Sequence, residues 1–427
     1  MRVLVIGGGG REHALVAALA RSKRVDAVLC APGNAGTAQV AENISIPVDD
    51  HEALIALAKE RAVDLTIVGP EAPLCAGIVD RFRDAGLRIF GPTAAGARIE
   101  GDKAYAKRLM KHAHVPTAEA RIFEHYDQAR AYVATRDTGV VVKASGLAAG
   151  KGVTVCDDPA EALLVLERIM VDQQFGEAGQ TVIVEEILKG QELSVHALID
   201  GQTIYVLETA QDHKAVGEGD TGPNTGGMGA YSPAPIATEE LLSYVDENVL
   251  VPIVDALRND GVDYSGVLYV GLMLTPGGPK VLEFNCRFGD PETQVILSRL
   301  ESDLFDLLEA VVDGKLADAD VRSTAKPSVC VVMASKGYPG AYERHKTIEG
   351  LDVAANMDDV HVYHAGTRLG NNRVLSTGGR VLGVTALGFD LADAKARAYQ
   401  AVDVIKFDNA FCRRDIADKA IHATAGS

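Results

Sequence analysis

The sequence predicts a multidomain protein of mixed α/β and α+β class, with an amino-terminal doubly wound parallel sheet and a small carboxy-terminal α+β domain. Its 427 residues exceed what a single hydrophobic core usually holds, so several compact units are expected. The first hundred residues alternate short apolar runs with amphipathic stretches, which is the pattern of βαβ units. Beyond residue 190 the apolar runs are longer and are separated by turn residues, as in antiparallel strands.

The amino-terminal unit covers residues 1–101. Its predicted strands lie at 3–6, 27–30, 65–68 and 88–90, and its predicted helices at 13–20, 52–59 and 78–85. Strands and helices that alternate in this way favour a parallel sheet with helices on its faces. Residues 102–121 are expected to be a linker into the centre of the chain.

The remaining units have other patterns. Residues 122–190 predict a small α+β unit, with strands at 140–143, 153–156 and 181–187 and a helix at 159–170. Residues 191–326 predict antiparallel strands at 193–199, 203–209, 266–275 and 280–284, with a hairpin turn at 276–279 and a helix at 238–259. Residues 327–427 predict a last unit, with strands at 329–333, 361–365 and 380–386 and a helix at 391–405.

The charge balance limits the classes of partner. The chain has 42 basic and 59 acidic residues, and its net charge of −17 opposes attraction to nucleic acid or to an anionic membrane. The apolar start, Val3–Ile6, is far shorter than a signal sequence or a membrane span. The six cysteines form no C-x-x-C pair, so neither a zinc knuckle nor a disulfide framework is indicated. We expect a cytoplasmic protein that binds neither nucleic acid nor membrane.

The first glycine loop runs from Gly7 to His13, between a strand and a helix. Backbone N–H groups and the helix dipole favour an anion such as a phosphate there. A dinucleotide fingerprint is disfavoured, because Glu12 stands where its third glycine belongs and no acid ends the second strand. A tight turn without a ligand is the alternative. A second turn at 32–37, which contains Asn34, could complete the same pocket.

The second glycine loop runs from Lys143 to Gly152 between two strands. It departs from a Walker A loop in its glycine spacing, in Gly152 at the Ser/Thr position, and in the strand that follows it. Such a loop can fold over nucleotide phosphates as a lid. Lys143 alternates with apolar neighbours, so a buried position for it would require an anion partner. An ordinary glycine-rich β-hairpin is the alternative.

The third loop, Gln211–Ser232, carries six glycines and the charged cluster Asp212-His213-Lys214. A stretch of this length without predicted structure, inside a compact domain, is usually functional. Its glycines at 226, 227 and 229 allow the backbone to approach a small substrate closely. A disordered surface linker is the alternative.

Glu283 and Asn285 stand two apart on a predicted strand, so both project to one face. A carboxylate beside an amide oxygen suits Mg²⁺, although a polar strand edge has the same spacing. Arg287 could neutralise a transferring phosphoryl group or hold a substrate carboxylate. Cys286 has no partner nearby in sequence and is expected to be a packed thiol. His196 alternates within an apolar strand, and a structural role is expected for it.

The order of these features resembles the ATP-grasp superfamily: a glycine loop with lysine, then Glu185-Glu186, Glu192 and Glu283-x-Asn285. Within it, the chain is closely similar to the family of phosphoribosylamine–glycine ligases, the glycinamide ribonucleotide synthetases. The resemblance includes VLVIGGGGREHAL at 3–15, AQDHKAVGEGDTGPNTGGMGAYSPAP at 210–235 and VLEFNCRFGDPETQ at 281–294. The AQDHK segment is highly specific, because generic nucleotide binders do not share it.

The resemblance implies a substrate-binding amino-terminal unit and central ATP-grasp domains, with residues 122–190 as a mobile lid and residues 191–326 as the core that holds the metal and glycine sites. It also implies a carbon–nitrogen ligase of de novo purine biosynthesis. That enzyme joins glycine to 5-phosphoribosylamine through a glycyl phosphate and forms glycinamide ribonucleotide, ADP and phosphate. ATP would be the co-substrate, Mg²⁺ (or Mn²⁺ in its place) the metal, and the enzyme a monomer or weak dimer.

The resemblance also implies roles for individual residues. ATP would be bound by Lys103, Lys143, Gly150, Lys151 and Gly152 at its phosphates, by Glu185, Glu186 and Leu188 at its adenine and by Glu192 at its ribose. The two other substrates would be bound by Gly8, Gly9, Gly10, Arg11, Asn34 and Glu71, and by Thr225, Gly226, Gly227, Met228 and Asp290. Catalytic roles fall to Asp212, Lys214 and Arg287, and metal binding to Glu283 and Asn285.

The chain departs from the family pattern at four places. Ser145 replaces the usual aspartate of the glycine loop, Ala417 replaces a glycine and His196 replaces a bulky apolar residue. In addition, no acid lies opposite Glu-x-Asn on the strand 268–274. The last departure leaves a second metal ion poorly supported. Three rival functions have been weighed: an ATP-grasp ligase with other substrates, a dinucleotide-dependent oxidoreductase and an inactive nucleotide-binding subunit.

Overall fold

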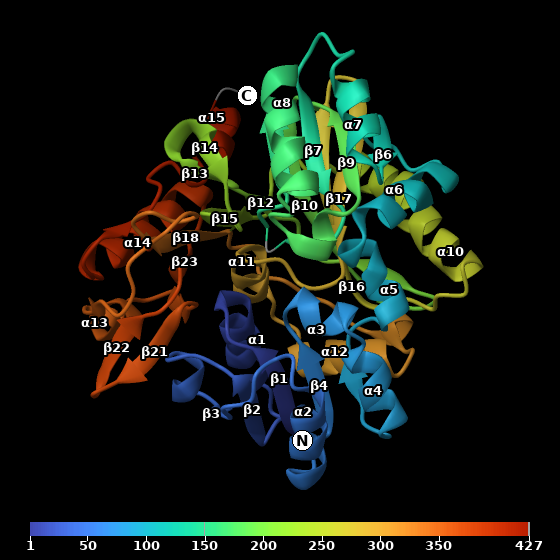
Figure 1. Cartoon of the computed structure of the whole chain (residues 1–427). Coiled ribbons are helices and arrows are strands. Elements are labelled where there is room, and N and C mark those ends of the chain that lie inside the picture. The colour runs from blue at the N-terminus through green and yellow to red at the C-terminus, as the bar shows by residue number, and fades with distance from the viewer. Residues whose placement is uncertain (149, 426–427) are drawn as a thin grey trace.

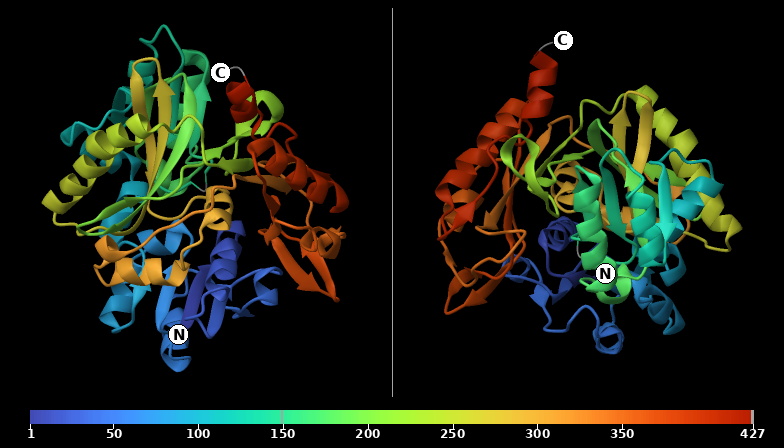
Figure 2. Two further views of the ribbon diagram at one scale, coloured as in Figure 1. Left: turned by 180° about the vertical axis from the view of Figure 1, so that it is seen from behind. Right: turned by 45° about the horizontal axis from the view of Figure 1, so that its top comes forward.

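The structure is a computed structural model that describes residues 1–148 and 150–425. Figure 1 shows the amino-terminal sheet at the bottom, the strands of the lid (residues 122–190) at the top and the carboxy-terminal strands at the left. The view from behind in Figure 2 shows the same three bodies around the long central strands. The predicted multidomain class is confirmed. No helix of the described residues is long and apolar enough to cross a membrane.

The amino-terminal unit is a five-stranded parallel sheet in the order β3-β2-β1-β4-β5, as predicted. Its strands are β1 (Arg2–Gly7), β2 (Ala27–Pro32), β3 (Glu42–Asn43), β4 (Leu65–Val68) and β5 (Ile89–Phe90). Its helices are α1 (Gly10–Ala20), α2 (His51–Glu60), α3 (Glu71–Cys75), α4 (Ile78–Asp84) and α5 (Ala94–Gly101). The strand order reverses between β1 and β4, so the loops after these two strands flank the crevice in which such sheets bind ligands.

The predicted linker at 102–121 contains a helix, α6 (Lys103–His112), which the sequence analysis missed. Asp102 caps the helix, because its side chain accepts a hydrogen bond from the Tyr105 N–H at 3.0 Å. Leu109 and Met110 are buried, so α6 packs as part of the core. The helix is short and rich in basic residues, which hides its apolar face in the sequence.

The lid is a four-stranded antiparallel sheet in the order β6-β9-β7-β8. Its strands are β6 (Ala120–Phe123), β7 (Val140–Ala144), β8 (Val153–Cys156) and β9 (Val182–Glu186). One face is covered by α7 (Tyr126–Val133) and α8 (Pro159–Leu166), and a π-helical turn at Glu167–Val171 extends α8. A separate hydrophobic cluster, drawn from residues 123–184 alone, fills this unit.

The core sheet is antiparallel in the order β11-β10-β16-β17. Its strands are β10 (Gln191–Asp200), β11 (Ile204–Val206), β16 (Ser265–Thr275) and β17 (Gly278–Asn285). The predicted helix at 238–259 consists of α9 (Glu239–Val245), a π-helical turn and α10 (Val251–Asn259). Two further helices, α11 (Glu292–Arg299) and α12 (Leu304–Val312), follow β17.

The sequence predicts no regular structure in the third loop, but the structure shows that this is wrong. It forms the short strands β12 (Gln211–Asp212), β13 (Ala215–Gly217), β14 (Thr221–Asn224) and β15 (Gly229–Ser232). β13 and β14 make a hairpin, whereas β12 and β15 join an antiparallel sheet of order β12-β15-β18-β23-β20. Strands of two to four residues carry too little periodicity to be recognised in a sequence.

This second large sheet crosses the predicted boundary at residue 326. β15 pairs with β18 (Ser328–Ser335), which pairs with β23 (Arg380–Leu387), and β20 (Val360–His364) lies at the edge. A small sheet of β19 (Thr347–Ile348), β21 (Thr367–Gly370) and β22 (Arg373–Ser376) lies beyond it. The remaining elements are α13 (Leu351–Ala355), α14 (Leu391–Val404), β24 (Ala410–Phe411) and α15 (Asp418–Ala425). The carboxy-terminal unit is therefore joined to the core by continuous hydrogen bonding.

Candidate active site

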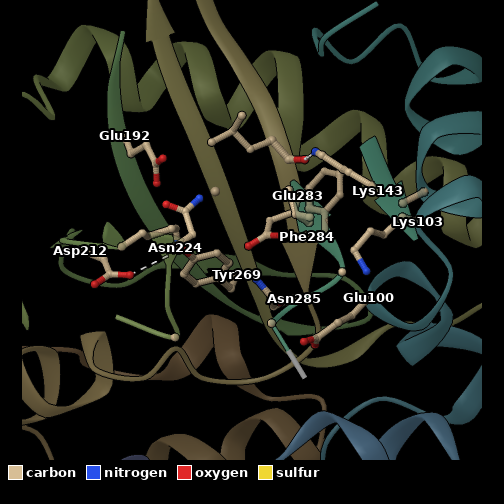
Figure 3. Close-up of a pocket in the computed structure, with 18 of the residues that line it drawn as sticks. Glu100, Lys103, Lys143, Glu192, Asp212, Asn224, Tyr269, Glu283, Phe284 and Asn285 are labelled. Carbon is tan, nitrogen blue, oxygen red and sulfur yellow. Dashed lines mark hydrogen bonds and ion pairs between the residues drawn. The ribbon is translucent and has the colours of Figure 1, made fainter. Parts of the chain in front are cut away.

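A cavity of about 550 Å³ lies where the lid, the core sheet, the amino-terminal unit and the carboxy-terminal unit meet. Figure 3 shows the Glu283 carboxylate between the side chains of Tyr269 and Lys103, with Asp212 and Glu192 on the far side of the cavity from Lys143. All four units contribute to one cavity, so the site exists only in the assembled chain.

Part of the cavity wall is apolar. Met110 comes from α6, Val141 and Val155 from the lid strands, and Leu282 and Phe284 from β17. Residues 186–188, at and after the end of β9, line the cavity too. An apolar slot with backbone donors and acceptors at its edge suits a planar heterocycle such as adenine.

Two of the predicted phosphate lysines face the cavity, together with Gly150 and Gly152. The Lys103 ammonium donates to the Gly146 carbonyl at 3.1 Å, which ties it to the glycine loop. The Lys143 ammonium lies 2.9 Å from a Glu185 carboxylate oxygen, so the anion partner expected for this buried lysine is present. Lys151, the third of these lysines, is exposed and is not among the described residues that line the cavity.

Ser145, where the family pattern has aspartate, has a structural use. Its hydroxyl donates to Asp102 Oδ1 at 2.8 Å and accepts the Ala104 N–H at 3.0 Å. Its carbonyl accepts the Lys103 N–H at 2.9 Å. The serine thus joins the glycine loop to the first turn of α6, and it holds Lys103 beside that loop.

Glu283 and Asn285 lie on one face of β17 and both line the cavity, as their spacing predicted. Burial opposes ionisation of Glu283, but nearby cations outweigh it and lower the pKa of its carboxyl. Asn285 Oδ1 accepts a hydrogen bond from Arg287 at 3.2 Å. One ionised carboxylate and one amide oxygen fit Mg²⁺, which takes few protein ligands when phosphates and water supply the rest. No cluster of three His, Cys, Asp or Glu side chains that could hold a metal occurs in the described residues.

Asp212 and Lys214 form a buried pair beside this face, with a distance of 3.3 Å between Lys214 Nζ and Asp212 Oδ2. Burial raises the pKa of the Asp212 carboxyl to about 7. Although burial opposes it, the surrounding anionic groups raise the pKa of Lys214 well above its usual value, so this ammonium stays charged. Asp212 Oδ1 is buried and receives no hydrogen bond from the described residues. An unpaired acceptor at a cavity wall is suited to a ligand with N–H groups.

Arg287 follows the face of Glu283 and Asn285 and is held by two carboxylates. Its guanidinium donates to Glu100 at 3.0 Å and lies 3.5 Å from Glu71. Glu100 also accepts the Cys286 N–H at 2.7 Å. The Cys286 thiol is buried, as expected, and its pKa is raised well above the usual value. Glu71 follows β4, so the arginine joins the core to the ligand crevice of the amino-terminal sheet.

The amino-terminal glycine loop has its own internal anion. The Gly9 N–H donates to Glu12 Oε2 at 2.5 Å, and Arg11 donates to Glu12 Oε1 at 2.6 Å. Arg11 and Glu71 line the cavity, whereas Gly8, Gly9 and Gly10 do not line it in the part of the chain that is described. The sequence places His13 at the end of this loop, whereas in the structure it lies in α1. Its Nδ1 accepts a hydrogen bond from the His364 N–H.

Asn34 is committed to the turn that contains it. Its amide nitrogen donates to the carbonyls of Gly8 and His364, and its oxygen accepts from the N–H groups of Gly36 and Thr37. These contacts use the hydrogen-bonding capacity of the side chain. The backbone of Asn34 is used in the same turn, because its N–H donates to Thr37 Oγ1 at 2.7 Å and its carbonyl accepts from Asn43 at 2.7 Å.

The third loop brings Thr225 and Gly226 to the cavity, but Met228 is fully buried and does not line it. Gly227 has φ +113°, and a Cβ there would lie 2.4 Å from Pro291 and 2.7 Å from Asp212, so only glycine fits. Asp290, for which a substrate contact is predicted, also lines the cavity.

The sequence analysis missed several residues at the cavity. Arg380 on β23 donates to the carbonyls of Gly226 and Asp290, both at 2.7 Å, and to the Asp290 carboxylate at 3.1 Å. Further missed residues are Glu100, Lys107, Asn224, Tyr269 and Glu292. Asn224 and Glu292 lie in the segments 210–235 and 281–294 that resemble the family, so the resemblance was the signal that could have found them.

His196 has the structural role that was expected. It is fully buried, burial lowers its pKa to about 4, and its Nε2 accepts the Gly289 N–H at 3.1 Å. The contact fixes the turn between β17 and α11, which carries Asp290. A neutral imidazole is required for this acceptor role.

Family models match most of the chain. They describe the N domain (residues 1–100), the ATP-grasp (A) domain (residues 101–293) and the C domain (residues 328–419) of phosphoribosylglycinamide synthetase. The chain belongs to the phosphoribosylglycinamide synthetase family. The resemblance to this family that the sequence indicates is confirmed, and so is the prediction of central ATP-grasp domains.

Members of the phosphoribosylglycinamide synthetase family resemble the chain over almost its full length. The phosphoribosylamine–glycine ligase of Rhodopirellula baltica is 52% identical and covers 98% of both chains, and that of Vibrio cholerae is 47% identical and covers 99% of both. The crystal structure of phosphoribosylamine–glycine ligase from Thermotoga maritima has a TM-score of 0.83 at 31% identity, covering 97% of this chain and 100% of that one. A biotin carboxylase from Campylobacter jejuni shares the fold alone, with a TM-score of 0.72 at 15% identity, covering 96% of this chain and 92% of that one.

Proposed function

We propose that the chain is a carbon–nitrogen ligase that uses ATP to join glycine to 5-phosphoribosylamine, and so makes glycinamide ribonucleotide, ADP and phosphate in purine biosynthesis. Membership of the family and relatives of that name over the whole chain support the reaction. The observation that carries it in the structure is a single cavity that joins an apolar slot, two lysines, the Glu283–Asn285 face and the crevice of the parallel sheet.

The chemistry that fits this cavity is transfer through a glycyl phosphate. The glycine carboxylate attacks the γ-phosphorus of ATP, and ADP leaves. The amine of phosphoribosylamine then attacks the acyl carbon, loses a proton, and phosphate leaves. The nucleophile belongs to the substrate, so no serine, cysteine or histidine nucleophile is needed. The chain's task is to position three substrates and to neutralise charge.

We assign this task to the residues that face the cavity. Lys103 and Lys143 neutralise the nucleotide phosphates, and residues 186–188 receive the adenine at the apolar slot. Glu192 would take the ribose hydroxyls. Mg²⁺, or Mn²⁺ in its place, would be held by Glu283 and Asn285 and would screen the phosphate charge. Arg11 and Glu71, at the crevice after β1 and β4, are the candidates for contact with the phosphosugar.

The glycine subsite is proposed between Asp212, Lys214 and Thr225. The unpaired Asp212 Oδ1 suits the glycine ammonium, since an ionised carboxylate accepts from such donors. Arg287 and Lys214 supply positive charge for the carboxylate of the bound glycine. Gly227 has no side chain, which keeps the wall of this small subsite close to Asp212.

We further propose that the lid moves to admit and enclose ATP. The hydrophobic cluster of the lid contains residues of the lid alone, so the lid can rotate as one body. The glycines of its loop at 143–152 allow the backbone to bend. Unchanged protease protection on adding ATP would contradict this motion. The six cysteines are free thiols, which agrees with a cytoplasmic enzyme. A monomer or weak dimer is the proposed assembly.

The test is detection of glycinamide ribonucleotide by mass spectrometry after incubating the purified protein with ATP, Mg²⁺, glycine and freshly formed phosphoribosylamine. Reactions that omit each substrate are the controls. ATP hydrolysis that ignores glycine would refute the ligase. Tight NADH binding without ATP binding would favour an oxidoreductase, but Glu12 fills the loop where a dinucleotide pyrophosphate would lie.

A further inference from the structure

Three buried charged side chains join the lid to the core beside the cavity. Glu185 on β9 has Oε1 at 3.0 Å from Lys107 Nζ and Oε2 at 2.9 Å from Lys143 Nζ. The exposed fractions of the three side chains are only 3%, 7% and 8%, in that order. Two cations share one carboxylate, so the group as a whole has one net positive charge.

Each lysine is also anchored to the core. Lys107, on α6, donates to Thr117 Oγ1 at 2.7 Å, and that hydroxyl donates to the Val281 carbonyl at 2.6 Å. Lys143, on the lid strand β7, donates to the Leu282 carbonyl at 3.2 Å. Glu185 Oε1 receives no hydrogen bond from the described residues, so its contact with Lys107 is an ion pair alone. The carboxylate is therefore held between a core cation and a lid cation.

The two lysines differ in what else they can bind. Both lysines line the cavity, but Lys143 belongs to the glycine loop and is the proposed phosphate ligand, whereas Lys107 donates to two protein oxygens, Thr117 Oγ1 at 2.7 Å and the Ala118 carbonyl at 3.4 Å. Burial lowers the pKa of Lys107, and Glu185 opposes that shift, so the carboxylate helps to keep this ammonium charged. A buried carboxylate in turn requires a cation at all times. When ATP engages Lys143, Lys107 is the cation that remains for Glu185.

We propose that Lys107 is a positioning residue which acts through Glu185: it neutralises this buried carboxylate and so leaves the charge of Lys143 free for the phosphates of ATP. The inference rests on the proposed ATP-dependent function. It assigns the Glu185 side chain to charge balance, while residues 187 and 188, which follow β9 and line the cavity, are left for the adenine. The nucleotide therefore meets one net positive charge at this group.

The inference predicts that ATP affinity falls when Lys107 is replaced and recovers when Glu185 is replaced as well. Lys107→Met removes one cation, and the group becomes neutral because Glu185 then pairs fully with Lys143. The dissociation constant of ATP should rise about tenfold. Adding Glu185→Gln to this variant restores one net positive charge, and the dissociation constant should return to within about threefold of the wild-type value. Lys107→Arg keeps the charge and should bind ATP nearly normally.

The experiment measures Mg-ATP binding by calorimetry, together with kcat and KM for ATP, in these variants of the full chain. Lys111→Met, on an exposed face of α6, is the matched control and should bind ATP as the wild type does. We expect the change in KM to exceed the change in kcat, since Lys107 does not touch the reacting atoms. A merely structural role would not produce the recovery in the double variant.

Several outcomes would overturn the inference. These are ATP binding by Lys107→Met within twofold of wild type, or a double variant that binds no better than Lys107→Met. Should Lys107→Met not fold, Glu185→Gln alone decides, because the inference expects ATP affinity equal to or above the wild-type value. A loss of affinity there would show that the Glu185 carboxylate contacts the nucleotide directly. Failure of the proposed function is distinguishable, because the wild type would then form no glycinamide ribonucleotide, whereas the inference is judged by the ATP affinities of the variants relative to wild type.

Discussion

Replacement of Glu283 by glutamine tests the centre of the proposed site. The substitution keeps the shape of the side chain and removes one negative charge from the metal-binding face of β17. Asn285 would be the only protein oxygen left on that face. Glu100 cannot replace the lost carboxylate, because it is held by Arg287 and by the Cys286 N–H.

The expected loss in kcat is at least about 100-fold. Loss of one preorganised electrostatic contact in an enclosed site costs about 10² to 10³ in rate, and 100-fold corresponds to about 2.7 kcal/mol in the activation barrier. The Mg²⁺ concentration for half-maximal rate should also rise, because the remaining amide oxygen is neutral. Initial rates of ADP formation over a Mg²⁺ series measure both effects, with the exposed Glu301→Gln as control.

The same substitution has a consequence for stability. The carboxyl of Glu283 has a lowered pKa in the folded protein despite its burial, because of four cations: Lys214, Lys143, Lys103 and Arg287. Its contribution to stability is therefore present above the unfolded pKa of 4.5 and is lost as the pH falls through the lower folded value. At pH 7, without metal or nucleotide, Glu283→Gln should melt at a lower temperature than wild type. Near-normal turnover at saturating Mg²⁺ would refute the assigned role.

Three further predictions address other parts of the site. Arg413→Met should lower the free energy of unfolding by about 2–4 kcal/mol in urea titrations, because this buried arginine pairs with Asp220 and Asp415, both partly exposed; an unchanged midpoint would contradict it. At saturating ATP and phosphoribosylamine, kcat/KM for glycine should rise about five- to tenfold from pH 6 to pH 8, because the Asp212 pKa of about 7 makes its carboxylate mostly ionised only above that pH; a flat profile would count against the ammonium contact. Gly227→Ala should lower kcat/KM for glycine at least about tenfold through the clash with Asp212. Gly219→Ala is the control and should not lower it, because Gly219 also has a positive φ, of +66°, but open space around it. Equal effects in the two variants would exclude the close approach to Asp212 as the cause.

The regular elements could be predicted from the sequence, because apolar runs and amphipathic stretches bounded by turn residues mark them. The apolar runs at 3–6 and 65–68 form neighbouring strands of the parallel sheet, and the strand at 266–275 pairs with the one that carries Glu283, as the hairpin turn at 276–279 indicates. The face shared by Glu283 and Asn285 followed from spacing alone. Local periodicity is the property that sequence reasoning reads best, and these elements depend on it.

The missed features depend on contacts between distant residues. Lys107 is buried because Glu185, far along the chain, neutralises it, and no local pattern announces that pair. Arg380 reaches the cavity because β23 belongs to the same sheet as β15, with β18 between them. Asn34 was assigned to substrate on its position in a turn, yet the same turn uses up its side chain. A resemblance places such residues in a motif but does not say which of their atoms are free.

The pairing of β15 with β18 affects how the chain can become active during synthesis. The paired residues Ser232 and Ser328 lie about a hundred residues apart, a stretch that a ribosome makes in roughly 5–20 s. Through that interval the strand bearing the end of the third loop has no neighbour on one side, and Arg380 has not yet been made. The nascent chain can therefore fold its amino-terminal sheet early, but it cannot close the substrate cavity until translation is nearly complete. A ribosome stalled between β15 and β18 should display a folded first domain and no ligase activity.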